Sequence, residues 1–186
     1  MFGGSFDPAH EGHVHITRIA LRRLQLDQIW WLVTPGNPLK AHGPAPLAQR
    51  MQHARTLIRH PRVKVTMVEA RLGTRYSADT LKALQRLYAQ RHFVWIMGAD
   101  NLAGLHRWEN WQAIMRQFPV AVLARPGQQR RALASVAARQ FRRARLLEAQ
   151  ARALASGKPP CWCFLRLPMR DISSSRLRAE GVWPQL

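Results

Sequence analysis

The run Ile29-Trp30-Trp31-Leu32-Val33 contains no charged side chain and no small polar one. A strand with one face in water alternates apolar and polar residues, whereas a continuous apolar run is typical of a strand that is covered on both faces. Four further apolar runs follow, most of them equally continuous: Val63 to Val68, Phe93 to Met97, Val120 to Ala124 and Trp162 to Leu165. Together they predict a parallel sheet with helices on both faces.

Helical periodicity separates these runs. Ile16, Ala20 and Leu24 recur every four residues, as one face of a helix requires. Two later segments repeat the pattern, with Met51, Ala54 and Leu57 or Ile58 in one and Leu81, Leu84, Leu87 and Tyr88 in the other. The chain therefore predicts an α/β fold, a doubly wound sheet in a single domain over residues 1–186. In such a sheet, ligands bind beyond the carboxyl ends of the strands.

The composition is strongly basic. Of the 186 residues, 29 are Lys or Arg and 10 are Asp or Glu, which gives a formal net charge of +19. Residues 128–160 are the part whose structure and role are hardest to assign from the sequence. Within them, 128–156 contain seven arginines and a single acid, Glu148, and their apolar face is narrow. We interpret this segment as a solvated surface of one or two helices and expect no nucleic-acid partner, with a nucleic-acid contact as the alternative.

The chain also lacks the marks of a membrane or secreted protein. No apolar run approaches the roughly 18 to 20 residues that cross a bilayer. The start MFGGSFDPAH does not have the basic-then-apolar layout of a secretory signal. We therefore expect a cytoplasmic protein without a membrane contact.

A glycine-rich loop precedes the first predicted helix, which begins near Val14. It reads GGSFDPAHEGH over residues 3–13. Glycines let backbone N–H groups approach an anion, and the start of a helix adds partial positive charge. His10 and His13 lie three residues apart at that start, where both can donate to one phosphate. The loop thus predicts a phosphate site.

The same histidines allow a zinc site as an alternative, with His10, His13 and His15 as ligands. The zinc motif HExxH places its histidines four apart on one helical face. Here HEGH places them three apart, across a junction that contains Gly12. We expect no metal held by the protein itself.

Both ends of the chain resemble the nucleotidyltransferase superfamily. Its (H/T)xGH motif is matched by His10-Glu11-Gly12-His13, preceded by GGSFDP. Its second motif, ISSTxxR, is matched by residues 172–178, ISSSRLR, in which Ser175 keeps the hydroxyl of the usual threonine. The resemblance implies a Rossmann-like fold and the transfer of a nucleotidyl group from ATP or CTP to a phosphate acceptor.

Three central stretches, Thr34 to Lys40, Glu69 to Leu81 and Trp95 to Ile114, resemble the bacterial nicotinate-nucleotide adenylyltransferases. The pantetheine-phosphate adenylyltransferases are the nearest alternative, but they are not expected to carry GADN and HRWENW. The resemblance implies adenylyl transfer from ATP to nicotinate mononucleotide in NAD biosynthesis. It further implies Mg²⁺ carried by ATP as the cofactor, and a monomer or small homo-oligomer.

The resemblance also implies roles for individual residues. The implied catalytic residues are His10, His13, Lys40 and Arg178. The implied ATP-binding residues are Gly3, Gly4, Ser5, Phe6, Gly98, Asp100, Ser173, Ser174 and Ser175. The implied residues for nicotinate mononucleotide are Tyr76, Ser77, Thr80 and Trp108, with core packing beside Trp111 as the alternative for Trp108.

Two features depart from the family pattern. Glu109 follows Trp108 where some relatives have a second aromatic residue, so we expect a less stacked ring pocket. Only Met1 and Phe2 precede Gly3, whereas the family has a full first strand there. We expect a truncated first strand, and unpaired backbone groups in its neighbours if it is missing.

Overall fold

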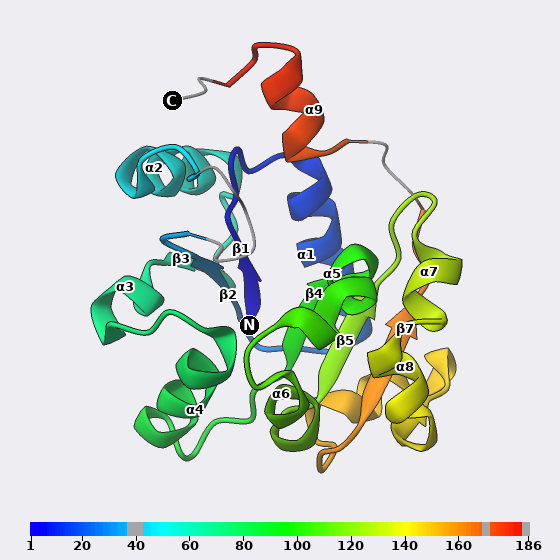
Figure 1. The fold of residues 1–186 in the computed structure, drawn as a ribbon. Coiled ribbons are helices and arrows are strands. Elements are labelled where there is room, and N and C mark those ends of the chain that lie inside the picture. Colours follow the sequence, from blue (N-terminus) through cyan, green and yellow to red (C-terminus); the bar gives the residue numbers. More distant parts are fainter. Residues whose placement is uncertain (37–42, 169–171, 184–186) are drawn as a thin grey trace.

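The structure is a computed structural model, and it describes residues 1–36, 43–168 and 172–183. Within them, seven parallel strands form one sheet in the order β3-β2-β1-β4-β5-β7-β6 (Figure 1). The strands are β1 (Phe2–Gly4), β2 (Ile29–Val33), β3 (Val63–Thr66), β4 (Trp95–Gly98), β5 (Val120–Leu123), β6 (Arg145–Leu146) and β7 (Trp162–Leu165). The predicted α/β fold with a parallel sheet is confirmed.

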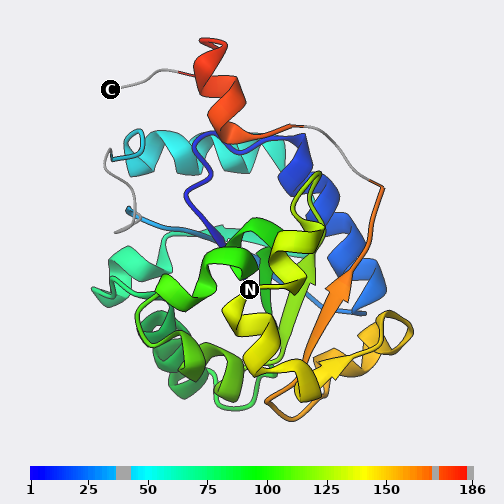
Figure 2. The ribbon, with the colours of Figure 1, turned by 45° about the vertical axis from the view of Figure 1, so that its right-hand side comes forward.

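Helices cover both faces of this sheet (Figures 1 and 2). One face packs against α1 (Glu11–Arg23), α2 (Leu47–Leu57) and a 3₁₀ helix (Glu148–Ala155). The other packs against α3 (Val68–Leu72), α4 (Ser77–Leu87), α5 (Ala99–Gly104), α6 (Trp111–Gln117), α7 (Gln129–Leu133) and α8 (Val136–Gln140). Shorter 3₁₀ helices span Leu105–Arg107 and Arg142–Ala144, and α9 (Ser174–Ala179) follows β7. None of the helices described is long and apolar enough to cross a membrane.

Alternate side chains of the central strands enter two separate cores. In β2, Trp31 and Val33 belong to the core under α1, and Leu32 belongs to the core under α4 and α5. In β4, Ile96 and Met97 divide in the same way. Both faces therefore exclude water, which is why these strands have near-continuous apolar sequences.

The first strand is short but present, at the centre of the sheet. Phe2 to Gly4 pair in parallel with Trp31 to Val33 of β2. On the other side, the N–H of Ile96 donates to the carbonyl of Met1 at 2.7 Å, and the Met1 amine donates to the carbonyl of Val94 at 2.6 Å. The centre of the sheet is thus filled, and the unpaired backbone groups expected of a missing strand do not occur at these positions.

Several boundaries differ from the predictions; for example, α1 begins at Glu11 and not near Val14, and β4 spans Trp95–Gly98 instead of Phe93 to Met97. The run Val63 to Val68 ends as a strand at Thr66, because Val68 already begins α3. In the basic segment, where we predicted helices, Arg145–Leu146 forms the edge strand β6 beside β7. A two-residue strand is too short to produce a recognisable alternation of apolar and polar residues.

Candidate active site

A cavity of about 450 Å³ opens at the carboxyl edge of the sheet, bounded by β1, the loops after β4 and β5, and α9. This edge is where a doubly wound sheet binds its ligands. Of the predicted site residues, His10, Thr80 and Arg178 are not part of the cavity lining, and Lys40 lies outside the described residues. The predicted residues that line it are Gly3, Gly4, Ser5, Phe6, His13, Tyr76, Ser77, Gly98, Asp100, Trp108, Ser173, Ser174 and Ser175.

His10 and His13 form a contacting pair at the start of α1, with ring centroids 3.9 Å apart. The Nδ1 atom of His10 accepts a hydrogen bond from the N–H of Gly12 at 3.1 Å. The Nδ1 atom of His13 accepts one from the N–H of His10, also at 3.1 Å. Because both Nδ1 atoms are acceptors, the hydrogen of each neutral ring is on Nε2. Each ring can therefore donate one hydrogen bond from Nε2.

Both imidazoles are neutral at pH 7. Burial, and then the charge of Arg125, lowers the pKa of His10 from 6.5 to about 4. Burial, followed by the charges of His10 and Arg125, lowers the pKa of His13 well below its usual value. The buried Nε2 of His10 has no hydrogen-bond partner among the described residues, although buried donors are normally paired. The pair is thus a set of uncharged donors, one of which lacks an acceptor within the described part of the chain.

Gly12 provides the space that this arrangement needs. A Cβ atom at position 12 would lie 2.8 Å from Nδ1 of His10 and 3.0 Å from Cγ2 of Ile172. The first distance is shorter than any ordinary contact, so a larger residue would displace the ring of His10. The glycine of the HxGH motif is therefore explained by close packing between α1 and the segment before α9.

Phe6 holds the histidine pair from the core side. Its backbone has φ +47°, an unusual value for a residue other than glycine. Its ring stacks on Trp31 at 4.7 Å and contacts the ring of His13 at 4.9 Å. With only 2 % of its surface exposed, Phe6 supports His13, and its contact with ATP stays a prediction.

Asp7 joins segments from both ends of the chain. Its carboxylate accepts hydrogen bonds from the N–H of Ala45 at 3.2 Å and from Nε1 of Trp183 at 2.8 Å. Arg178, on α9, pairs with this carboxylate at 3.5 Å and donates to the carbonyl of Asp7. Arg178 also donates to the hydroxyl of Ser175 at 3.3 Å. Through these contacts Arg178 anchors α9. We expected Arg178 to bind phosphate in the cavity, but it is not part of the cavity lining.

The three serines of the second motif place the start of α9 at the cavity. The hydroxyl of Ser173 caps α9 by accepting from the N–H of Arg176 at 3.2 Å. The hydroxyl of Ser174 donates to the carbonyl of Pro8 at 2.9 Å. The second bond ties α9 to the loop that precedes α1, and Figure 1 shows the two segments side by side. The binding of ATP by these serines stays a prediction.

A second group of residues lines the cavity at the start of α4 and near it. Tyr76 and Ser77 lie at the start of α4, whose first turn has no side-chain cap. The N–H groups of its first turn and its dipole favour an anion. The guanidinium of Arg75 lies over the ring of Tyr76, 5.8 Å from its centroid, and Trp108 also lines the cavity. A flat ring with a carboxylate group would fit here.

Thr80 and Trp111 belong to the structural core rather than to the lining. The hydroxyl of Thr80 is buried, bonded to Thr74 Oγ1 at 2.7 Å and to the carbonyl of Tyr76 at 3.2 Å. Thr80 therefore shapes the start of α4 and is not part of the cavity lining, and its contact with nicotinate mononucleotide stays a prediction. Trp111 is buried against Phe141, with ring centroids 6.0 Å apart.

Comparison with known proteins agrees with this arrangement. The model of the cytidylyltransferase-like family matches residues 1–180. A protein of Cereibacter sphaeroides (strain ATCC 17023), named Probable nicotinate-nucleotide adenylyltransferase, is 60 % identical over 183 residues, covering 98 % of this chain and 97 % of the relative. This chain belongs to the nicotinate-nucleotide adenylyltransferase family.

A further relative supports the assignment to this adenylyltransferase family, and a solved structure shares the fold. A Ruegeria pomeroyi protein with the same name is 59 % identical, over 98 % of this chain and 86 % of its own length. The solved structure of Plasmodium falciparum nicotinic acid mononucleotide adenylyltransferase complexed with NaAD has a TM-score of 0.71. It covers 96 % of this chain and 80 % of that one. At 16 % identity, it shows the shared fold alone.

The adenylyltransferase cavity contains charged residues that the sequence patterns did not indicate. Arg107, Arg125 and Glu69 line it, and Arg125 forms an ion pair with Asp100 at 3.3 Å. Arg125 directly follows a predicted strand, and this position could have indicated a role at the site, because ligands bind at the loops that follow the strands. Glu69 lies inside a helix and gave no such signal; burial raises its pKa. Glu109, the departure from the family pattern, lines the cavity as well.

Trp108→Ala should separate ring binding from core packing in this adenylyltransferase. We expect the KM for nicotinate mononucleotide to rise about tenfold, because one stacking surface is lost, while the KM for ATP changes little. Steady-state kinetics and a melting curve measure this. Trp111→Ala is the control, expected to lower stability by about 3 to 5 kcal/mol without a selective effect on KM. If Trp108→Ala instead lowers only the melting temperature, Trp108 is a core residue.

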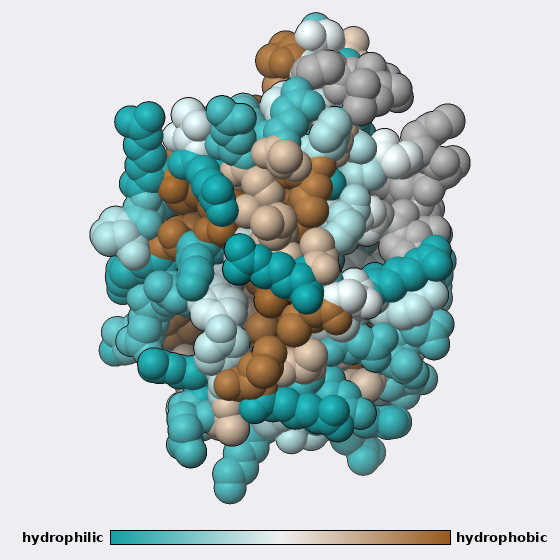
Figure 3. Space-filling model, turned by 90° about the vertical axis from the view of Figure 1, so that its left-hand side faces the viewer, coloured by the Kyte–Doolittle hydropathy of each residue, from teal (hydrophilic) through white to brown (hydrophobic). Residues whose placement is uncertain are grey.

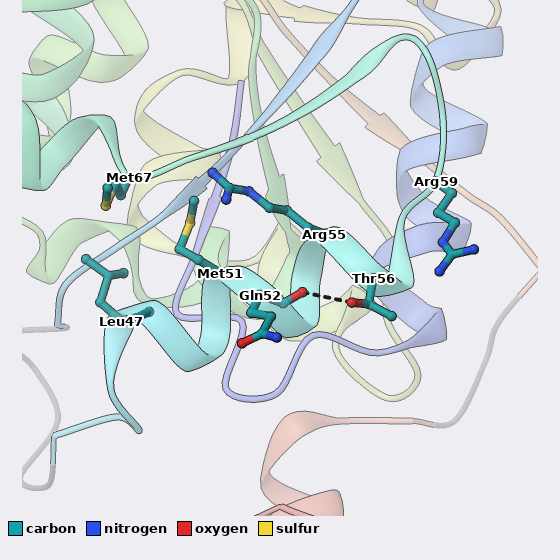
Figure 4. A pocket seen from close by; sticks show the side chains of 8 residues that line it. Leu47, Met51, Gln52, Arg55, Thr56, Arg59 and Met67 are labelled. Carbon is teal, nitrogen blue, oxygen red and sulfur yellow. Dashed lines mark hydrogen bonds between the residues drawn. The ribbon is translucent and has the colours of Figure 1, made fainter.

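A second hollow lies on the outer side of α2, with a volume of about 770 Å³. Figure 4 shows Leu47, Met51 and Met67 on one side and Arg55 and Arg59 extending along it. The face on the left of Figure 1 carries small apolar areas among hydrophilic side chains (Figure 3). None of the predicted site residues that the structure describes lines this hollow, so it is not the candidate active site.

The described residues contain no cluster of side chains suited to bind a metal ion. No group of three His, Cys, Asp or Glu side chains in residues 1–36, 43–168 and 172–183 could hold an ion. Asp100, with its side chain 43 % exposed, is an oxygen donor at the cavity, but it is paired with Arg125. This set fits Mg²⁺ only as an ion that is coordinated mainly by nucleotide and water.

Proposed function

We propose that this protein transfers the adenylyl group of ATP to nicotinate mononucleotide, which gives nicotinate adenine dinucleotide and pyrophosphate in NAD biosynthesis. The observation that carries the proposal is a single cavity lined by His13, a neutral donor in contact with His10, and also by Tyr76, Ser77 and Trp108. The names of relatives that are about 60 % identical support it.

The reaction is a displacement at the α-phosphate of ATP. A phosphate oxygen of the mononucleotide forms the new P–O bond, and the bond from the α-phosphate to the leaving pyrophosphate breaks. The attacking group is already an anion, so it needs no general base. Catalysis therefore consists of alignment and of donors placed where charge develops. His13, together with His10 and the backbone at Gly4 and Ser5, supplies such donors in this proposal.

The proposal extends to Mg²⁺ carried by ATP, which would neutralise phosphate charge. Lys40 and Arg178 remain candidates as phosphate cations, Arg178 after leaving its contacts with Asp7. A cytoplasmic location follows from the metabolic role. A monomer or small homo-oligomer stays a prediction.

The nicotinate acid should be a better acceptor than the amide. The uncapped start of α4 and the guanidinium of Arg75 favour a carboxylate, and charge-assisted hydrogen bonds contribute about 1.5 to 3 kcal/mol. We therefore expect kcat/KM for nicotinate mononucleotide to exceed that for nicotinamide mononucleotide by about 10- to 100-fold.

Pyrophosphate release measures this directly, with ATP and each of three acceptors: nicotinate mononucleotide, nicotinamide mononucleotide and phosphopantetheine. A preference for phosphopantetheine would replace the proposal with the pantetheine-phosphate reaction. A kcat/KM for the amide equal to or above that for the acid would overturn the assigned acceptor.

A further inference from the structure

Arg125 lines the cavity, and the proposed reaction does not yet give this cation a role. It follows β5 by two residues and lines the cavity, with 27 % of its side chain exposed. Arg75 and Arg107 also line the cavity among the described residues. Arg125 follows β5, which pairs with β4, and β4 pairs with β1, the strand that leads into the loop of His10 and His13. After burial, the charge of Arg125 also lowers the pKa of both histidines. Arg125 therefore lies at the histidine end, where the phosphates would bind.

The guanidinium of Arg125 is held in a defined place. Its Nε lies 3.3 Å from Oδ1 of Asp100. A Cβ atom at Gly98 would lie 2.5 Å from this Oδ1 and 3.0 Å from Nε of Arg125. Gly98 pairs with Leu123 in adjacent strands, which brings the two loops together. The glycine thus leaves the space in which the ion pair forms.

The cavity needs a permanent positive charge at this end. The triphosphate and the acceptor phosphate are both anions, and the paired histidines provide donors without charge. Arg178 is occupied with Asp7 and Ser175. An arginine remains protonated at all physiological pH values, and its planar fork can bind two phosphate oxygens at once.

We propose that Arg125 is a catalytic residue, whose guanidinium binds the phosphates of ATP and stabilises the charge that moves onto the leaving pyrophosphate, with Asp100 as its positioning residue. This inference rests on the proposed adenylyl transfer. The stabilised charge is greater in the transition state than in bound ATP, so the loss of Arg125 should lower kcat and not only raise KM.

Arg125→Gln tests this inference. We expect kcat to fall by about 10² to 10³, as for the loss of one transition-state donor, with the KM for nicotinate mononucleotide nearly unchanged. Arg125→Lys keeps the charge but not the fork, so it should recover only part of the lost kcat. Arg143→Gln removes an equal charge from an exposed residue outside the cavity, and should keep kcat within about twofold.

A second measurement does not depend on turnover. Calorimetric binding of pyrophosphate should weaken at least about tenfold in Arg125→Gln and stay unchanged in Arg143→Gln. If Arg125→Gln does not fold, Arg125→Lys gives the same comparison for kcat and for binding.

The outcomes separate the two proposals. A wild-type protein that releases no pyrophosphate with any acceptor would overturn the proposed function. If the wild-type protein is active and Arg125→Gln, with an unchanged melting temperature, keeps more than about a third of kcat and binds pyrophosphate normally, the role of Arg125 is wrong.

Discussion

His13→Ala lowers kcat by about 10² to 10³, because it removes a donor that strengthens as charge develops on the α-phosphate. It also lowers stability. The N–H of His10 loses its acceptor, and a buried unpaired donor costs about 1 to 3 kcal/mol. Steady-state kinetics with ATP and nicotinate mononucleotide, together with urea unfolding, measure both effects.

Two further variants of His13 separate its two ring nitrogens. His13→Asn places an amide oxygen where Nδ1 accepts from His10, so stability should recover while kcat stays low. His13→Gln extends an amide donor toward the position of Nε2, so part of kcat should return. A folded His13→Asn that keeps more than about a tenth of the wild-type kcat would remove His13 from the catalytic residues.

Arg50→Met lowers the free energy of unfolding by about 3 to 5 kcal/mol, which is among the largest effects of a single substitution. Arg50, on α2, is completely buried. Its guanidinium donates to four backbone carbonyls: Ala45 at 2.6 Å, Ser5 at 2.6 Å, Thr34 at 2.8 Å and Pro35 at 3.1 Å. Methionine fills a similar volume but leaves these buried acceptors without donors.

Arg55→Met is the matched control for this substitution. Arg55 lies on the same helix but extends over the outer surface (Figure 4), and its loss should change stability by no more than about 0.5 kcal/mol. Urea unfolding of both variants measures the difference. Equal, small effects in the two variants would show that the carbonyls around Arg50 find other donors.

The local sequence was sufficient for the architecture. The runs Ile29–Val33 and Trp162–Leu165 are strands over the predicted residues, because a strand between two helical layers must be apolar on both sides. The motif around His10 and His13 likewise begins a helix at the carboxyl edge, since glycines and a helix start are local features. These predictions depend on residues that are close in the chain.

Only the tertiary structure decided what the individual arginines do. Among 29 Lys and Arg residues, nothing local distinguishes the buried Arg50. A motif indicated Arg178 and the end of a strand could have indicated Arg125, but neither pattern shows that Arg178 anchors α9 or that Arg125 pairs with Asp100. Each role depends on a partner that is distant in the chain; Arg178 and Asp7 are 171 positions apart. Burial and pairing determine what a charge does, and both arise only when the sheet brings such segments together.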